Sequence, residues 1–231
     1  SSAMLAAQLD CLWHDLPPVA IKIGMLADAG QVAQLAAWLA QLPAPRPPVI
    51  YDPVFSASCG VALAAPELRA AVVELLLPHV SLLTPNSDEL AALSGLAVED
   101  DASAITAGRK LQQLGCHSLL LKAGHSDWQG AECRDLWLVA DEAWVLARPR
   151  LVSAQGHGSG CVLASAIATL LAQGESLGDA LVVAGACLQQ GLGQVEALGA
   201  AAVMEIDAGR ARACVEIGVA DHATALARLI A

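Results

Sequence analysis

Basic residues are scarce in this chain. Only 12 Lys and Arg stand against 23 Asp and Glu among 231 residues, and the formal net charge is −11. Binding to nucleic acid or to an anionic membrane needs a basic face that offsets phosphate repulsion, so this charge argues against both partners. An anionic small molecule would have to be held by a few local groups. The chain also lacks about 18 consecutive apolar residues, and its most apolar stretch, Cys161 to Ala172, is interpreted as a buried helix.

Paired cysteine motifs are absent as well. The seven cysteines are an odd number without CxxC or Cys/His spacings, so we expect neither a disulfide framework nor a zinc site, but a cytoplasmic protein. The opening residues SSAMLAAQLD lack the basic region of a signal peptide and an initiator Met, which we interpret as a chain that begins after its natural start. Aromatic residues make up only 3%, and the 56% hydrophobic content, largely Ala, Leu and Val, predicts a sheet packed between helices.

Short apolar runs alternate with longer Ala- and Leu-rich segments of helical periodicity. This order predicts one α/β domain over residues 1–231, with a mostly parallel, doubly wound sheet flanked by helices on both faces in three layers. The expected strands are residues 19–25, 49–52, 81–85 and 118–124, and the expected helices between them are 31–42, 66–77, 86–94 and 102–114.

The pattern changes after Gly124. Residues 135–140 and 143–149 flank Asp141-Glu142 closely enough to form a hairpin. We then expect helices at 161–172 and 177–192, and one or two further helices in residues 198–231.

Polar side chains follow the expected strands. Ligands of doubly wound sheets bind beyond the carboxyl ends of the strands, so these positions are candidates for a site. They are Asp52, Thr84, Asn86, Glu89, Lys122 and His125.

The segment GHGSGC at 156–161 carries the strongest local signal. Its glycines permit tight backbone geometry before a helix whose first N–H groups would form an anion hole. At the mouth of that helix the dipole would lower the pKa of the Cys161 thiol, which could then deprotonate a substrate hydroxyl. The alternatives are a structural Gly turn and an ordinary buried Cys161.

Each of the other candidates also has two interpretations. Glu89 lies one helical turn after Asn86 and could hold Mg²⁺ through water, or the two residues could form a capping box. Lys122 at a strand end could meet a phosphate, or it could pair with a carboxylate. Asp52 could orient a metal or a substrate, although Asp-Pro is also a turn signal.

Five ordered segments carry a family resemblance: KIGML at 22–26, YDPV at 51–54, LLPHVSLLTPNSDEL at 76–90, LLLKAGH at 119–125 and GHGSGC at 156–161. In these segments the chain resembles the hydroxymethylpyrimidine/phosphomethylpyrimidine kinases of thiamin biosynthesis, which belong to the ribokinase-like superfamily. The resemblance implies transfer of the ATP γ-phosphate to 4-amino-5-hydroxymethyl-2-methylpyrimidine and then to its monophosphate. It also implies a homodimer. Pyridoxal kinase is the nearest alternative, because a Cys at the position of Cys161 is typical of the pyrimidine kinases and of some pyridoxal kinases.

The resemblance also implies residue roles. The matching positions are Cys161 as base with Gly158 and Gly160 lining the anion hole, Lys122, Asn86, Ser159 and His157 for ATP, and Asp52 and Glu89 for Mg²⁺. Two departures are visible: Gly156 and Ser159 stand where the family usually has Thr, and the family's amino-terminal strand and glycine-rich segment are not recognisable. This second departure leaves a noncatalytic ligand-binding relative as a further alternative.

Overall fold

The computed structural model describes residues 2–55, 65–124, 130, 132–150, 159–193, 196–198, 201–203 and 226–229. Its main element is a seven-stranded sheet with the order β1-β2-β3-β4-β5-β6-β9, and β7 and β8 form a separate two-stranded ribbon. The strands are β1 (Ile21–Ile23), β2 (Val49–Tyr51), β3 (Leu82–Leu83), β4 (Ser118–Leu121), β5 (Glu132–Val139), β6 (Glu142–Pro149), β7 (Glu196–Leu198), β8 (Ala201–Val203) and β9 (Leu226–Leu229).

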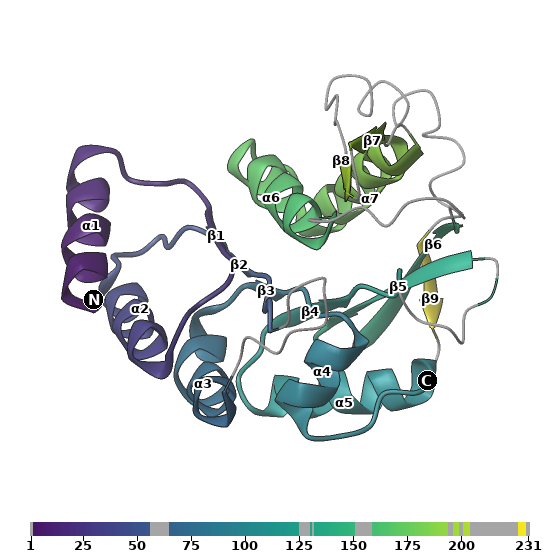
Figure 1. Ribbon diagram of the computed structural model, residues 1–231, viewed down its shortest axis with the longest axis horizontal. Helices are drawn as coiled ribbons and strands as arrows, with labels where there is room; N and C mark the ends of the chain where they lie inside the picture. The colour runs from purple at the N-terminus through teal and green to yellow at the C-terminus, as the bar shows by residue number, and fades with distance from the viewer. Residues whose placement is uncertain are drawn as a thin grey trace.

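Strands β1 to β4 are parallel and follow one another across the sheet in chain order. Right-handed crossovers between strands in this order place the connecting helices on one face. Figure 1 shows α2 to α5 on that face, α1 beside α2 beyond the β1 edge, and α6 and α7 on the other face. The helices are α1 (Ser2–Asp15), α2 (Ala29–Gln41), α3 (Pro66–Ala71), α4 (Ser87–Ser94), α5 (Asp101–Gln113), α6 (Ser159–Ala172) and α7 (Leu177–Gly193), and α3 continues into a π-helical turn, Val72–Leu76, and a 3-10 turn, Leu77–His79.

The core consists of two apolar clusters, one on each face of the sheet. In β2, Val49 and Tyr51 belong to the cluster under α2 and α5, whereas Ile50 between them packs with residues of α6 and α7. All three residues are buried because successive side chains of a strand point to opposite faces, and both faces are covered by helices. This two-sided burial explains why the parallel strands read as continuous apolar runs.

Local sequence signals fix the helix ends. Asp28, Asn86 and Asp100 each accept a hydrogen bond from the backbone N–H of the third helical residue, at the starts of α2, α4 and α5. Gly95 ends α4 with a φ of 67°, in the left-handed region that glycine adopts without strain. None of the helices in the described part of the chain combines the length and the apolar character needed to cross a membrane.

The expected three-layer α/β fold is confirmed, and so is the hairpin, although β5 begins at Glu132, three residues before the expected start at 135. The expectation of helices in residues 198–231 is wrong for the described residues, which form strands there. Strand β9 pairs antiparallel with β6, with Ala227 opposite Val145. A ladder of backbone hydrogen bonds at the sheet edge outweighs the weak helical preference of such a short apolar segment.

Candidate active site

The candidate site lies at the carboxyl ends of β1 to β4, at the amino-terminal end of α6. Asp52 directly follows β2, and Lys122 directly follows β4. The backbone N–H of Lys122 donates to Pro85 O at 2.8 Å, and Asn86 and Lys122 form an isolated parallel bridge. The parallel pairing therefore continues just beyond β3 and brings the predicted residues of three strand ends together.

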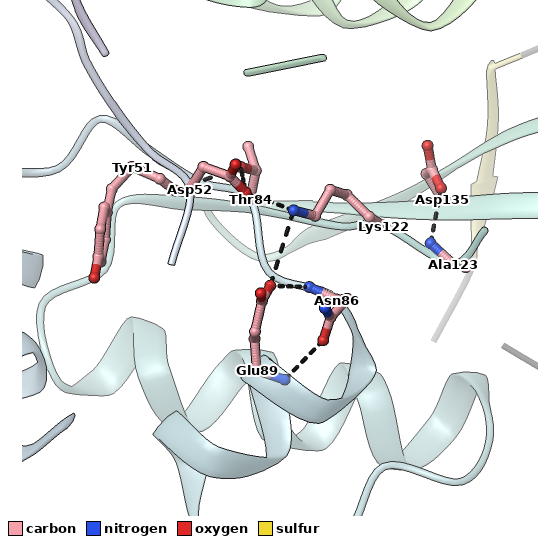
Figure 2. Close-up of polar contacts among 8 residues, drawn as sticks. All are labelled: Tyr51, Asp52, Thr84, Asn86, Glu89, Lys122, Ala123 and Asp135. Carbon is pink, nitrogen blue, oxygen red and sulfur yellow. Dashed lines mark hydrogen bonds and ion pairs between the residues drawn. The ribbon is translucent and has the colours of Figure 1, made fainter. Parts of the chain in front are cut away.

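Lys122 is the centre of this arrangement. Its Nζ lies 2.5 Å from Asp52 Oδ1 and 3.8 Å from Glu89 Oε2 (Figure 2). The Asp52 side chain is 1% exposed and that of Lys122 is 15% exposed, so the charges compensate each other in a largely desolvated position. The carboxylate pairing that was one of the two interpretations of Lys122 is therefore present. Its partners are Asp52 and Glu89, which were both candidate site residues.

One carboxylate oxygen of Asp52 has no partner within the part of the chain that the structure describes. Oδ1 accepts from Lys122 and, at 3.5 Å, from Thr84 Oγ1, whereas the buried Oδ2 accepts no hydrogen bond. A buried carboxylate oxygen without a donor is costly unless a further cation, water or donor meets it. The described residues offer no group of three or more metal ligands, so a Mg²⁺ held here would take part of its shell from phosphates and water.

Glu89 and Asn86 form the capping box of α4. Asn86 N donates to Glu89 Oε2 at 2.7 Å, and Glu89 N donates to Asn86 Oδ1 at 2.8 Å. Burial raises the pKa of Glu89 above its ordinary value, and the Lys122 ammonium and the Asn86 N–H oppose that rise. Capping fixes the Glu89 carboxylate near Lys122, so the structural interpretation of the motif and a role in the site are compatible.

The first turn of α6 packs directly on the ion pair. A Cβ atom added to Gly160 would lie 2.9 Å from Lys122 Nζ and 3.8 Å from Asp52 Oδ1, so only glycine fits there without moving the lysine. Ser159 begins the helix beside it, and Cys161 follows in the same turn. Gly158, His157 and His125 lie outside the described residues.

The thiol of Cys161 does not have the lowered pKa that the sequence predicted. Burial and the neighbouring Asp52 carboxylate raise its pKa, and the Lys22 and Lys122 ammonium groups offset only part of this rise. The prediction considered the helix dipole alone and could not include a carboxylate from β2. The thiol is therefore mostly protonated at neutral pH in this arrangement.

Two charged residues of this region were not found from the sequence. Lys22, the middle residue of β1, interacts electrostatically with Cys161, and a lysine between two isoleucines of a strand was the signal available. Asp135 of β5 is 1% exposed, forms an ion pair with Arg148 of β6, and accepts from Ala123 N at 2.9 Å. Figure 2 shows Asp135 over the residue that follows Lys122, so the antiparallel hairpin holds the end of β4 in place.

A cavity of about 170 Å³ lies elsewhere, at the opposite ends of the strands. Its lining includes Val49, Ser81 and His117, each at or just before the start of β2, β3 or β4. The cavity and the pair Asp52–Lys122 thus lie at opposite ends of the strands. The candidate site is therefore identified by its buried charges and not by this cavity.

The arrangement of layers is similar to that of two solved structures. A pyridoxal kinase from Staphylococcus aureus, in complex with AMP-PCP and pyridoxal, superposes with a TM-score of 0.79 over 90% of this chain and 74% of that chain, at 23% identity. A phosphomethylpyrimidine kinase from Clostridium difficile 630 gives a TM-score of 0.69 over 82% and 76%, at 24% identity. At these identities the likeness shows the fold alone.

Sequence comparisons are more specific. The model of the phosphomethylpyrimidine kinase family matches residues 1–204. A hydroxymethylpyrimidine/phosphomethylpyrimidine kinase of Rhizobium meliloti (strain 1021) is 35% identical over 211 residues, 91% of this chain and 75% of that protein. A thiamine biosynthesis bifunctional protein of Geobacter sulfurreducens is 36% identical over 179 residues, which are 78% of this chain and 36% of that protein. The chain belongs to the phosphomethylpyrimidine kinase family, which confirms the family expected from the sequence.

Proposed function

We propose that this chain transfers the γ-phosphoryl group of ATP to the hydroxyl of 4-amino-5-hydroxymethyl-2-methylpyrimidine, and then a second one to the resulting monophosphate. Family membership supports this activity. The observation that carries it is the buried Lys122–Asp52 pair beneath the first turn of α6. A cation and helix N–H groups that converge on one point suit the charge of a phosphoryl group during transfer.

The charged side chains divide into two roles. Lys122 and the backbone of Ser159 and Gly160 would hold ATP phosphates, because they present positive charge and N–H donors at the strand edge. Asp52, through its unpartnered Oδ2, and Glu89 would hold Mg²⁺, directly or through water. Bound Mg²⁺ would neutralise charge on the phosphates.

Cys161 would act as the base in the first transfer. Its thiolate takes the proton of the substrate hydroxyl while that oxygen forms a bond to the γ-phosphorus, and the bond from the γ-phosphorus to the bridging oxygen breaks to release ADP. The second transfer differs, because its attacking group is an oxygen of the substrate phosphate. The second pKa of such a phosphate is about 6, so this oxygen is already ionised at neutral pH and needs no base. The two reactions therefore make different demands on one site.

The test is an ADP-release assay with the pyrimidine alcohol, its monophosphate and pyridoxal offered separately, with and without Mg²⁺. We expect Mg²⁺-dependent turnover on both pyrimidines and at least tenfold lower kcat/KM on pyridoxal. A preference for pyridoxal would contradict the proposed substrate, and nucleotide binding without turnover on any acceptor would contradict the proposed activity.

A further inference from the structure

Lys22 occupies an unusual position in β1. Its neighbours Ile21 and Ile23 pack into the apolar cluster on the α2 side of the sheet. Lys22 therefore points to the other face, where its register partner Ile50 is buried with residues of α6 and α7. Figure 1 shows α6 over the end of the sheet that contains β1 and β2.

The side chain of Lys22 is directed toward the carboxyl end of its strand. A Cβ atom added to Gly24, two residues further along, would lie 2.9 Å from Lys22 Nζ. The ammonium is also close enough to Cys161 to act on its thiol electrostatically. Lys22 Nζ thus reaches the same strand edge as Asp52, from the side opposite to β4.

Lys22 has no ionic partner among the residues that the structure describes. The ion pairs found there are Lys122 with Asp52 and Glu89, Arg134 with Asp101, and Arg148 with Asp135. Lys22 is half-buried, and an ammonium that is partly removed from water without an anion carries a desolvation cost. Lys122 at the same edge is paired with Asp52 and Glu89, whereas Lys22 forms no ion pair within the described part of the chain.

We propose that Lys22 binds the phosphate of the monophosphate acceptor and thereby determines how well the site accepts the second substrate. This inference rests on the proposed function. The strand order places Lys122 on one side of Asp52 and Lys22 on the other, so a nucleotide held at Lys122 leaves the β1 side for the acceptor. Cys161, which would contact the acceptor, is within electrostatic range of the Lys22 ammonium.

The charges of the two acceptors explain why Lys22 should matter more for the monophosphate than for the alcohol. The pyrimidine alcohol brings no phosphate, whereas the monophosphate brings about −1.5 to −2 charges near pH 7. Asp52 and Glu89 would repel that phosphate. A charge-assisted hydrogen bond from Lys22 would compensate for this repulsion, and the alcohol has no need of it.

The experiment compares the variants K22M and K22R with the wild type, by kcat/KM for each acceptor at saturating ATP and by direct binding of the monophosphate without ATP. For K22M we expect a loss of about 10- to 100-fold on the monophosphate, weaker monophosphate binding, and a clearly smaller loss on the alcohol, because Lys22 also lowers the pKa of the Cys161 thiol. K22R should recover most of the loss because it retains the charge. K110M, which removes a lysine from the last turn of α5, is the matched control and should resemble the wild type.

Three results would overturn the inference. The first is an equal loss of kcat/KM on both acceptors in K22M. The second is a higher KM for ATP in K22M without an effect on the acceptors, and the third is an unchanged kcat/KM on the monophosphate. Failure of the proposed function would look different, because the wild type itself would phosphorylate neither pyrimidine. Circular dichroism of each variant shows whether the fold is retained, and K22R provides the comparison if K22M does not fold.

Discussion

Lys122 and Asp52 are 70 positions apart in the chain, and their Nζ and Oδ1 atoms lie 2.5 Å apart in the folded protein. Each directly follows a buried strand, β4 or β2, and β3 lies between those two strands. The pair is largely inaccessible to water, so removal of one partner leaves the other as an uncompensated buried charge. The ion pair that organises the candidate site therefore also stabilises the fold.

The first prediction concerns this pair. K122M should lower the free energy of unfolding by about 3 kcal/mol, because Asp52 is then buried as an unpaired carboxylate. The double variant D52N/K122M should regain most of that stability while it remains inactive. Urea unfolding together with the ADP-release assay measures both quantities. Equal midpoints of K122M and the wild type would show that the pair contributes nothing to stability.

The second prediction concerns Glu89 and pH. Its pKa in the folded protein is raised above the ordinary 4.5, so the folded state holds this proton more tightly than the unfolded state does. Stability from this group is therefore full below about pH 4.5 and is lost as pH rises through the folded pKa. E89Q avoids that loss and retains an oxygen for the Asn86 N–H.

In thermal melts, the Tm of E89Q should therefore exceed that of the wild type by an amount that grows from pH 4 to pH 7. The kinase activity of E89Q should be lower than that of the wild type. E67Q removes an exposed carboxylate from the first turn of α3 and serves as the control, with no such trend. A Tm difference that is constant with pH would contradict the prediction.

The third prediction separates capping from function. N86A removes the cap of α4 and should cost about 1 kcal/mol of stability. It should also reduce activity, because Asn86 Oδ1 and N hold the backbone and the carboxylate of Glu89. D100A removes the corresponding capping box of α5, away from the site, and should lower stability without lowering activity. Chemical unfolding and initial rates of both variants measure stability and activity. Normal activity of N86A would show that the cap is not needed to position Glu89 for catalysis.

The fourth prediction compares the two transfers at Cys161. C161A should lower kcat/KM on the pyrimidine alcohol by at least about 100-fold, the usual contribution of a general base, and on the monophosphate by less than about 10-fold. The exposed Cys11 provides the control C11S, which should have no effect.

The pKa of Cys161 also predicts a pH profile. Its thiol pKa is raised above the ordinary 9.0, so the thiolate fraction and the rate on the alcohol should increase through pH 7 to 9 without a plateau. A plateau near pH 7, or equal losses of C161A on both acceptors, would show that Cys161 is not the base.

Local sequence patterns were sufficient to predict the secondary structure around the site. Alternation of apolar runs with helical segments predicted β1 to β4 and the hairpin, since these elements depend on local periodicity and turn residues. The capping pattern from Asn86 to Glu89 was visible for the same reason, because both partners lie within one helical turn. Strand-end positions then indicated which residues could share an edge.

The interactions between these residues became visible only in the folded protein. Lys122 pairs with Asp52 and packs against Gly160, and these residues lie far apart in the chain. That Lys22 has no ion pair among the described residues also follows only from the fold. The raised pKa of Cys161 likewise comes from burial and from Asp52 on another strand. Such electrostatic effects depend on distance and desolvation in space, which local sequence patterns do not encode.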